Sequence, residues 1–462
     1  MTPDANDLCV FAVKRGDIEK RIDPHANHPK FQVIFNRLKK YTVLPLKDYA
    51  TNIFSGITPK SGGDAYTESE DGVLFVKSGC LSNDGYITID ETSRIKHETH
   101  NGLMKSSQLR YKDVLIAIVG ATIGKVGLFD LTVDANINQA IAAVRLNDNL
   151  LPEFLVAYLL SPIGQTYLEF LKRPVARANI NLQEIGEIGI PLLSVDQQER
   201  FINLFYYYRD QKEQKLKQAD ELLSKTSDYI LKELGIGEIV YKENLGRATT
   251  LSQIRKDNTL GVEYYHPERM KALHSLLSNP LLRLEKLGDI VFFHRNVVAI
   301  SDSSNYLGLA GVESQTGELS GAKEEAAGQA YCYTKGNVLY GRLRPYLNKV
   351  LYAEKDGICS TEFHVMEVKD ENEILPEYLS EILRSNLILS QTRHMMTGNT
   401  HPRISNDDMK NLYIPIPNIT LQKTIIAEIH NRRIKARQLK IEAEREWKAA
   451  KEQFEKELLT EH

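Results

Sequence analysis

Two patterns of apolar and polar residues recur along this chain, and they occur twice in the same order. In two long stretches, at about 195–234 and about 421–459, apolar residues lie mostly three or four positions apart. This spacing, kept over several heptads, predicts helices with a coiled-coil seam. At about 1.5 Å per residue, about forty residues form a rod of about 60 Å. We expect the two helices to pair with each other rather than to lie each on its own globular domain. The expected seam residues are Phe201, Phe205, Tyr208, Leu223, Ile230, Ile429, Ala436, Leu439, Trp447 and Phe454.

The segments before the long helices predict mixed α/β structure. Turn-forming sequences such as SGGD at 61–64 and SNDG at 82–85 separate short apolar runs, which is typical of strands. A Leu-Pro-Glu sequence follows at 151 and again at 375, and its proline suits the first turn of a short helix. The sequences GIPLL and YIPIP then end the irregular part. Ser194 and Gln197 have the spacing of a capping box at the start of the first long helix.

The chain contains an internal repeat. LPEFLVAYLLS begins at Leu151 and LPEYLSEILRS at Leu375, an offset of 375 − 151 = 224. The same offset relates Lys125-Val126 to Lys349-Val350, Ile190-Pro191 to Ile414-Pro415, and Gln198 to Gln422. Upstream the offset drifts to 238 and 241. A tandem duplication of a unit of about 220 residues explains the series, with loops of variable length in the first part of each copy.

Composition excludes several classes of protein. The 462 residues suffice for two or three domains, and 42% hydrophobic with 26% charged residues is ordinary for a globular protein. The net charge of −3 means that any nucleic-acid surface must be a local basic patch. The four cysteines form no CxxC pair, the N-terminus has no signal-peptide pattern, and the longest apolar run is too short to span a bilayer. We therefore expect a soluble cytoplasmic protein without a membrane partner.

One sequence, VGATIGKV at 119–126, resembles a nucleotide-binding loop. A P-loop needs four residues between its first glycine and Gly-Lys, then Ser or Thr. Here three residues separate Gly120 from Gly124, and Val126 follows Lys125. The counterpart in the second copy, GRLRPYLNKV at 341–350, has no glycine at the corresponding positions. We interpret both sequences as turns between strands, and we expect no ATP site.

No catalytic pattern stands out elsewhere. His97 and His100 lie three apart without a third ligand or an HExxH frame, so we expect a solvated turn there and no metal site. The chain has no Asn/Asp-Pro-Pro-aromatic loop, no Asp…Glu-x-Lys nuclease core and no Gly-x-Ser-x-Gly elbow. The sequence therefore predicts a protein without enzymatic activity.

The duplicated order of motifs resembles the DNA-specificity subunit of type I restriction–modification systems. The matching sequences in the first copy are VLIAIVGATIGKVGLF, NQAIAAVRL at 138–146, LPEFLVAYLLS and EIGIPLLSVDQQERF. Those in the second copy are GNVLYGRLRPYLNKV, STEFHVMEV at 360–368, LPEYLSEILRS and LYIPIPNITLQK. The resemblance covers nearly the whole chain and rests on the order of the motifs rather than on any single one.

The resemblance implies an α+β fold, a tandem pseudo-twofold repeat of two mixed α/β target-recognition domains separated by two long antiparallel coiled-coil helices. The implied domains are an N-terminal arm at 1–20, recognition domains at 21–193 and 246–417, a central spacer helix at 194–245 and a C-terminal spacer helix at 418–462. Each recognition domain would read one half of an asymmetric, split site in double-stranded DNA. Two methyltransferase subunits would dock on the chain, and two motor–nuclease subunits can join them. S-adenosylmethionine, ATP and magnesium would belong to these partners, and none to this chain.

Basic and amide side chains in two regions of each copy are the candidate DNA contacts. One region is the turn between the paired strands, and the other is FLKRPVARANIN at 170–181 or QTRHMMTGNTHPR at 391–403, which occupy equivalent positions. Such side chains bind phosphates and read base edges. The candidates are Thr122, Lys125, Lys172, Arg173, Arg177 and Asn179 in the first copy, and Arg342, Arg344, Tyr346, Lys349, Arg393, His394, Asn399 and Arg403 in the second.

Two alternatives remain open at this point. A close variant of the first interpretation is the recognition subunit of a two-chain system whose partner fuses methyltransferase and nuclease. A protein of a different class, a coiled-coil scaffold with no role on DNA, would show the same long helices. The sequence of the DNA site and the spacer length in base pairs do not follow from the chain.

Overall fold

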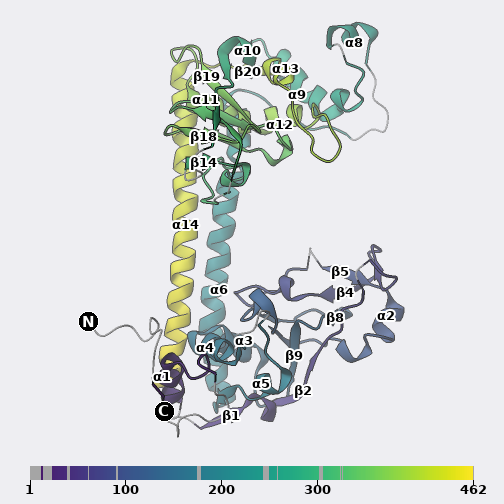
Figure 1. Ribbon diagram of the computed structural model, residues 1–462, viewed down its shortest axis with the longest axis vertical. Helices are drawn as coiled ribbons and strands as arrows, with labels where there is room; N and C mark the ends of the chain where they lie inside the picture. Colours follow the sequence, from purple (N-terminus) through teal and green to yellow (C-terminus); the bar gives the residue numbers. More distant parts are fainter. Residues whose placement is uncertain are drawn as a thin grey trace, which may run out of the picture. The chain divides into compact units, whose positions relative to one another are not determined.

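The computed structural model describes residues 12–13, 23–38, 42–60, 62–89, 92–173, 178–242, 249–257, 259–300, 305–322, 324 and 326–460. The chain forms two compact units, one of Met1–Lys215 with Ile441–His462 and one of Leu216–Lys440. The boundaries between them fall within the two long helices, so each unit contains one strand-rich repeat and a part of both helices (Figure 1).

The first unit contains two four-stranded sheets and a small ribbon. The main sheet has the order β2-β9-β6-β7, the second sheet β3-β5-β4-β8, and β1 pairs with β10. Its elements are α1 (Pro29–Leu38), β1 (Val43–Pro45), η2 (Leu46–Asp48), β2 (Ala50–Ser55), β3 (Tyr66–Thr67), β4 (Val73–Val76), η3 (Ser78–Cys80), β5 (Ser93–Ile95), α2 (His97–Asn101), η4 (Lys105–Ser107), β6 (Val114–Ala117), η5 (Gly120–Thr122), β7 (Val126–Leu128), β8 (Ala135–Ile137), β9 (Ile141–Leu146), α3 (Pro152–Leu160), α4 (Pro162–Leu171), α5 (Leu182–Gly186), β10 (Gly189–Pro191) and the start of α6 (Val195–Ser224).

The second unit repeats this order after the end of α6. Its main sheet is β12-β19-β16-β17, and β11 pairs with β20. Its second sheet has the order β13-β15-β18-β14, so β15 pairs with β18, whereas in the first unit β5 pairs with β4. Its elements are α7 (Thr226–Glu233), α8 (Leu251–Asp257), η6 (Glu263–Tyr265), α9 (Pro267–Leu277), β11 (Leu284–Lys286), α10 (Leu287–Ile290), β12 (Val291–His294), β13 (Val297–Ala299), β14 (Tyr306–Leu307), η8 (Leu309–Gly311), β15 (Gln329–Tyr333), β16 (Val338–Gly341), η9 (Pro345–Leu347), β17 (Val350–Tyr352), β18 (Gly357–Cys359), β19 (Phe363–Val368), α11 (Pro376–Arg384), α12 (Asn386–Thr392), α13 (Asn406–Lys410), β20 (Tyr413–Pro415) and α14 (Ile419–Thr460). The predicted α+β repeat is confirmed.

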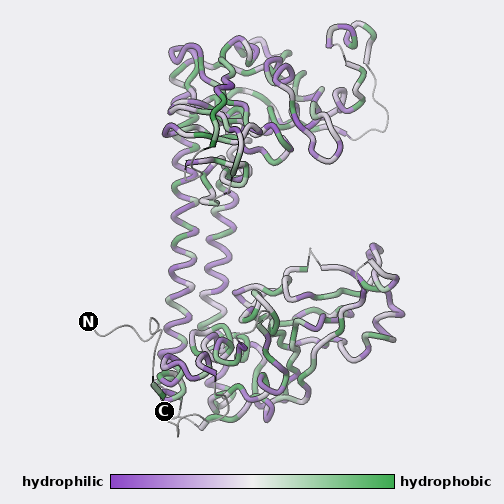
Figure 2. Tube along the Cα trace, in the orientation of Figure 1, coloured by the Kyte–Doolittle hydropathy of each residue, from purple (hydrophilic) through white to green (hydrophobic). Residues whose placement is uncertain are grey.

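The main sheet of each unit is covered on both faces, which explains the continuous apolar runs. In β6, Val114 and Ile116 belong to the core formed with the helices, whereas Leu115 and Ala117 belong to the core formed with the second sheet. Because successive side chains of a strand point to opposite faces, a strand buried on both faces has no polar positions. The green stretches of Figure 2 include these strands and helix α3.

The offset between the copies is less uniform than the sequence analysis assumed. In β6 and β16, Val114 corresponds to Val338, and their partners across the sheet are Val144 and Met366. The residue numbers of these two partners differ by 366 − 144 = 222, whereas equivalent residues in the hairpins and in the Leu-Pro-Glu helices differ by 224. The connection before β9 is therefore two residues longer than the one before β19, and the connection after β9 is two residues shorter than the one after β19.

The repeated glutamine forms the same buried contact in both units. The Gln198 side chain accepts a hydrogen bond from the backbone N–H of Leu151 (2.8 Å) and donates to the carbonyls of Asn149 (3.0 Å) and Leu193 (3.2 Å). Gln422 does the same with Leu375 (2.9 Å), Glu373 (2.8 Å) and Pro417 (2.8 Å). Both side chains are buried, so this contact fixes the first turn of each long helix to the start of the Leu-Pro-Glu helix.

The two long helices begin as predicted, but the first is interrupted. Ser194 and Gln197 form the expected capping box, with hydrogen bonds of 3.0 and 3.3 Å. Helix α6 ends at Ser224 and α7 begins at Thr226, so the helix expected to run to residue 234 breaks at Lys225. α14 runs without interruption from Ile419 to Thr460.

Within each unit the segments of α6 and α14 lie side by side and antiparallel (Figure 1). In the first unit the ring centroids of Phe205 and Trp447 lie 4.7 Å apart and those of Phe201 and Phe454 lie 5.0 Å apart. In the second unit Lys440 forms an ion pair of 3.1 Å with Asp220. Of the expected seam residues, Tyr208, Leu223 and Leu439 are partly exposed, and the buried ones are Phe201, Phe205, Ile230, Ile429, Ala436, Trp447 and Phe454.

In the described part of the chain, no single helix is long and apolar enough to cross a membrane. Helices α3 and α4 reach that threshold only when taken together across a bend of 77°. Seven consecutive residues of α3, from Phe154 to Leu160, are buried in the core of the first unit.

Candidate nucleic-acid interface

The sequence that resembles a nucleotide-binding loop is the turn of a β-hairpin. β6 and β7 pair antiparallel, with Val114 opposite Leu128, and the single turn η5 connects them. β16 and β17 form the equivalent hairpin around η9. A P-loop would instead open a helix with its backbone N–H groups around a phosphate. The prediction of two equivalent hairpins is confirmed.

The backbone of this turn is the same in both copies although its residues differ. Gly120 and Gly124 have positive φ angles of 73° and 98°. The equivalent residues, Arg344 and Asn348, also lie in the left-handed region, at 50° and 51°. Asparagine enters this region at small cost, but arginine does so rarely. The turn therefore holds the Arg344 side chain, which is exposed, on a backbone that favours glycine.

Each turn is paired with the second candidate region of its own copy. In the first unit the N–H of Gly120 donates to Ala178 O (2.8 Å), and the N–H of Ile180 donates to Ile118 O (2.9 Å). In the second unit the N–H of Arg344 donates to Pro402 O (2.8 Å), and that of Ile404 to Arg342 O (3.0 Å). The structure thus brings the two predicted regions together in both copies. We refer to each turn with its paired segment as a turn platform, comprising residues 118–125 with 178–181, and 342–349 with 397–404.

On the first turn platform the side chains differ in how far they are engaged. Lys125 is half-buried and forms no side-chain hydrogen bond or ion pair with the described residues. Thr122 donates to Val119 O (3.0 Å) within the turn, and Asn179 is exposed.

Beside this platform, two predicted basic residues are held by carboxylates. Arg173 pairs with Glu184 (2.8 Å), and Lys172 lies 3.5 Å from Glu169. Arg177 falls outside the described residues. The first platform therefore presents Lys125 as its most available cation within the described chain.

On the turn of the second platform, Arg344 and Tyr346 are exposed and form no side-chain hydrogen bond or ion pair in the described ranges. Arg342 is half-buried. Lys349 is occupied, because its ammonium group donates to Leu309 O (2.7 Å) and Val312 O (2.8 Å). The lysine repeated in the two copies thus has two different environments.

In the paired region of the second unit, Asn399 is exposed and the other predicted residues have partners. Arg403 binds Glu362 through Nε and Nη2, at 2.9 and 2.7 Å. Hydrogen bonding to Arg403 holds the pKa of Glu362 below its usual value. Arg393 lies 3.5 Å from Glu268, and His394 Nε2 lies 2.8 Å from the same carboxyl group.

His364 lies beneath the second turn platform, and the sequence analysis did not identify it. His364 on β19 is buried, and its Nε2 lies 3.3 Å from Ile404 O. Burial, followed by the charge of Arg342, lowers the pKa of His364 to about 4. The histidine is therefore neutral under ordinary conditions. Only its place one strand away from the turn, known from the fold, could have revealed it.

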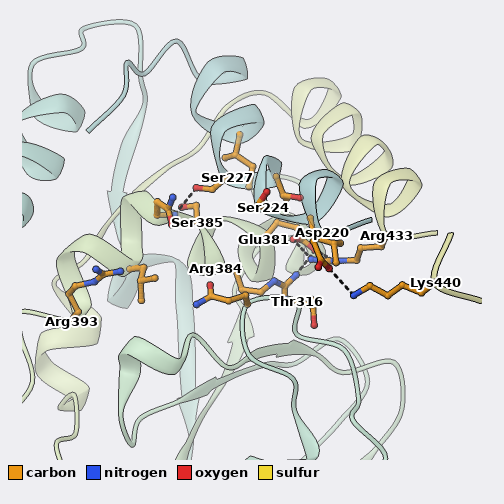
Figure 3. A pocket seen from close by; sticks show the side chains of 16 residues that line it. Asp220, Ser224, Ser227, Thr316, Glu381, Arg384, Ser385, Arg393, Arg433 and Lys440 are labelled. Atoms are coloured by element: carbon orange, nitrogen blue, oxygen red, sulfur yellow. Dashed lines mark hydrogen bonds and ion pairs between the residues drawn. The ribbon is translucent and has the colours of Figure 1, made fainter. Parts of the chain in front are cut away.

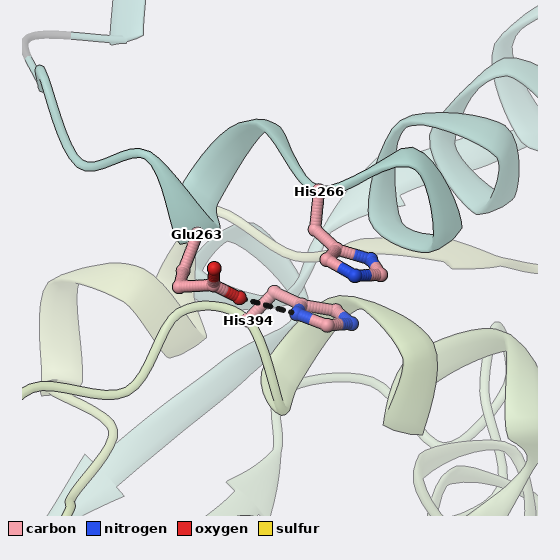
Figure 4. A group of neighbouring side chains, drawn as sticks. All are labelled: Glu263, His266 and His394. Carbon is pink, nitrogen blue, oxygen red and sulfur yellow. Dashed lines mark hydrogen bonds and ion pairs between the residues drawn. The ribbon is translucent and has the colours of Figure 1, made fainter. Parts of the chain in front are cut away.

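Three side chains in the second unit are close enough to suggest a metal site, but their orientation is unsuitable (Figure 4). Candidate ligand atoms of Glu263, His266 and His394 lie within 4.8 Å of one another. The two imidazoles are stacked, however, with centroids 3.7 Å apart and planes 7° from parallel. A metal bound by a histidine nitrogen lies close to the ring plane, and one ion cannot lie in two parallel planes. As arranged, the cluster is a packed histidine pair.

The other pair of histidines does not form a site either. His97 is exposed on α2, with Nε2 2.9 Å from Asp71 O. His100 is buried, contrary to the solvated turn that we expected, and its Nδ1 lies 2.6 Å from Asn136 Oδ1. A buried hydrogen-bonded histidine of this kind stabilises the first unit.

Known proteins resemble this chain in sequence and in fold. The specificity subunit of the type I restriction enzyme EcoBI from Escherichia coli is 27% identical over 212 residues, which cover 44% of this chain and 44% of that subunit. The EcoDI specificity subunit, also from Escherichia coli, is 24% identical over 168 residues, covering 35% and 36%. The matched regions thus span less than half the length of these curated relatives. A chain in a solved structure of a type I restriction–modification system has the same fold, with a TM-score of 0.51 at 13% identity over 90% of this chain and 97% of that chain.

The family comparison covers both repeats. The type I restriction modification DNA specificity domain matches residues 67–221 and 294–444, which together form more than half of the chain. Each match includes one turn platform and the first part of the long helix that follows it. The chain therefore belongs to the type I restriction–modification DNA specificity family.

Proposed function

We propose that this chain is a non-catalytic subunit that recognises an asymmetric, bipartite site in double-stranded DNA, with each repeat reading one half-site. The observation that carries the proposal is the pair of turn platforms. Their backbones are held by the same hydrogen bonds, whereas their side chains differ. A constant backbone with variable side chains suits two modules that meet DNA in the same way but read different bases.

The available charges indicate that the chain alone binds DNA weakly. Several basic residues near the platforms are held by carboxylates, such as Arg173 by Glu184 and Arg403 by Glu362. Lys125 and Arg344 are more available, and the net charge of the chain is −3. Because non-specific affinity grows with the number of phosphates neutralised, partner subunits would supply much of the attraction to the DNA backbone.

Membership in the specificity family and the likeness to type I restriction enzymes support the proposed partners. Two methyltransferase subunits would dock on the chain and modify the recognised site, and two motor–nuclease subunits would join for restriction. The S-adenosylmethionine, ATP and magnesium that these reactions use would bind to the partners. The assembly would act on DNA in the cytoplasm.

Mapping of methylated bases tests the proposal. Co-expression of this chain with its cognate methyltransferase in a host that lacks other methylation should modify one bipartite motif, detected by single-molecule sequencing. Omission of this chain should abolish the modification. If the pattern is the same with and without the chain, it does not direct methylation, and a scaffold role is the better explanation.

Two variants separate the half-sites. Lys125→Ala in the first repeat should relax one half of the motif, and Arg344→Gly in the second repeat should relax the other half. Each variant serves as the control for its counterpart, since both remove one cation from equivalent turns. Equal loss at both halves in either variant would refute the assignment of one half-site to each repeat.

A further inference from the structure

The second unit contains a cavity of about 510 Å³ (Figure 3). Its walls come from the end of α6, from α7, α11, α12 and α14, and from the loop that carries Thr316. This volume is in the range of small-molecule sites. Leu223, Ile230 and Leu389 contribute apolar surface, and most other lining residues are polar or charged.

The cavity has an excess of positive charge. Four cations, Arg384, Arg393, Arg433 and Lys440, line it together with two carboxylates, Asp220 and Glu381. Lys440 pairs with Asp220 at 3.1 Å, and Arg393 lies 3.5 Å from Glu268, which is not among the lining residues. Arg384 and Arg433 then face the single carboxylate of Glu381, an excess of one positive charge.

Glu381 joins two of these arginines. Its two oxygens accept hydrogen bonds from Arg433, each at 2.7 Å, and one also pairs with Arg384. Burial by itself raises the pKa of Glu381, but the charges of Arg384 and Arg433 outweigh burial and keep the pKa below its usual value. One ionised carboxylate therefore faces two guanidinium groups.

Two of the arginines retain unused donors. Arg384 is 8% exposed, and its Nη1 donates to Val350 O (2.5 Å). Its Nε, like the Nε of Arg393, is buried without a hydrogen-bond partner in the described part of the structure. A buried donor without an acceptor is costly, but these two Nε atoms have almost no accessible surface, so the charge of the guanidinium groups, rather than these donors, would attract an anion into the cavity.

The equivalent place in the first unit is identified by the loop. Ser82-Asn83-Asp84-Gly85 corresponds to Ser314-Gln315-Thr316-Gly317. Bridges close both loops, between Leu81 and Ile87 and between Val312 and Leu319. The glycines have φ angles of 87° and 69°. Counted back from these glycines, Asp84 and Thr316 occupy the same position, and the second loop has one additional residue, Glu313, before the matched sequence.

In the first unit a carboxylate and an indole fill this place. The Asp84 carboxylate accepts hydrogen bonds from Trp447 Nε1 (2.6 Å) and from Lys212 Nζ (2.9 Å). Trp447 is 2% exposed and Lys212 8% exposed, and the Asp84 side chain is 25% exposed, so the contact is largely buried. The protein supplies its own anion here.

In the second unit none of the three residues is charged, and the residues that correspond to Trp447 and Lys212 are smaller. The offset of 224 along the long helices, fixed by the shared glutamine contact, places Leu223 where Trp447 lies and Ala436 where Lys212 lies. Thr316 replaces Asp84, and its hydroxyl donates to Glu313 at 3.2 Å. The aromatic ring and the anion are missing at the place where the cavity lies, while arginines line its wall.

We propose that this cavity binds a small phosphate monoester, whose dianionic group meets the arginines and whose organic part lies against Leu223, Ile230 and Leu389. The ligand would replace the carboxylate and the ring that Asp84 and Trp447 provide in the first unit. It would stabilise the second unit by mass action, in proportion to its concentration. This inference does not depend on DNA recognition.

Calorimetric titration of the full chain with phenyl phosphate at constant ionic strength tests the proposal. We expect a single saturable site with a dissociation constant of about 1 mM or below. Filling the cavity with Leu223→Trp and Thr316→Asp together should weaken binding at least about tenfold, since the variant recreates the residues of the first unit. Lys440→Ala, a change at a half-exposed side chain, should weaken binding severalfold and serves if the filled variant does not fold.

Arg344→Gly is the matched control, because it removes a cation from the turn platform and leaves the cavity intact. It should bind phenyl phosphate as tightly as the parent chain. The proposal fails if the parent shows no saturable heat. It also fails if a folded filled variant or Lys440→Ala binds as tightly as the parent, or if Arg344→Gly loses binding to the same extent as these variants.

Discussion

Arg344 offers a way to separate the stability of a recognition turn from its contact with DNA. The residue has φ 50° and ψ 63°, and its side chain has no partner in the described residues that would compensate for this conformation. A left-handed backbone costs a residue with a Cβ about 1–2 kcal/mol. Glycine avoids this cost but loses about 0.5–1 kcal/mol more conformational entropy on folding. Arg344→Gly should therefore leave the free energy of unfolding unchanged or raise it by about 1 kcal/mol.

Arg344→Ala provides the comparison, because alanine removes the same charge but keeps the Cβ. It should be less stable than Arg344→Gly by up to about 1 kcal/mol, measured by denaturant unfolding. In the assembled complex both variants should lose about 1–3 kcal/mol of affinity for the target duplex, which fluorescence anisotropy would measure as a roughly 5- to 150-fold rise in Kd.

The two measurements can fail separately. Arg344→Gly that unfolds more readily than Arg344→Ala would show that the turn does not need a left-handed residue at this position. Affinity that is unchanged in both variants would remove Arg344 from the DNA interface, whatever the stability. In the first copy, Gly120→Ala is the reciprocal test, since no heavy atom lies within 4 Å of the added Cβ and only the backbone cost of about 1 kcal/mol remains.

Three further predictions concern the scaffold. Gln198→Ala should cost about 2–3 kcal/mol by removing the buried side chain that pairs with three partly buried backbone groups, whereas Gln197→Ala at the exposed cap should cost about 1 kcal/mol or less in the same denaturant titration. His364 has a pKa of about 4 in the folded chain and about 6.5 when unfolded, so stability that is present above pH 6.5 is lost as the pH falls. The loss should reach about 2 kcal/mol at pH 5. The free energy of unfolding of His364→Gln should lack this part of the pH dependence. Phe454→Ala should cost about 3–5 kcal/mol, because its ring packs in a fully buried aromatic cluster, while its exposed neighbour Gln453→Ala should cost less than about 0.5 kcal/mol by thermal unfolding.

Local patterns were sufficient to predict the elements and their repetition. The hairpins, the Leu-Pro-Glu helices and the capping box at Ser194 depend on neighbours within a few positions, and the structure contains all of them. The break at Lys225 depends on tertiary contact as well. Ser and Thr side chains compete for helix carbonyls around it, and Ser227 accepts a hydrogen bond from the N–H of Asn386 at the start of α12 (2.7 Å). A residue 159 positions away thus helps to fix where α7 begins.

The sequence could not predict which candidate side chains bind other groups of the chain and which are available to a ligand. Lys125 and Lys349 align in the repeat and follow equivalent turns. Lys349 donates to carbonyls of η8 and of the residue that follows it, 40 and 37 positions earlier, in the part of the repeat where loop lengths vary. Lys125 has no such partner among the described residues. Aligned residues can therefore be structural in one copy and available in the other.

Comparison of the two copies distinguishes positions where the fold requires a particular side chain from positions where it requires only a backbone conformation. Gln198 and Gln422 form the same hydrogen bonds, because each side chain is buried and both accepts from and donates to the backbone of its copy, which an amide can do and a hydrocarbon side chain cannot. Gly120 and Arg344 share only a backbone conformation, so the residue can vary if its cost is accepted. Arginine at a left-handed position, where glycine would be less strained, is most simply explained by a use for its side chain. That reasoning favours Arg344 among the basic candidates of the second copy, since Lys349, Arg393 and Arg403 have partners within the chain and Arg342 is half-buried.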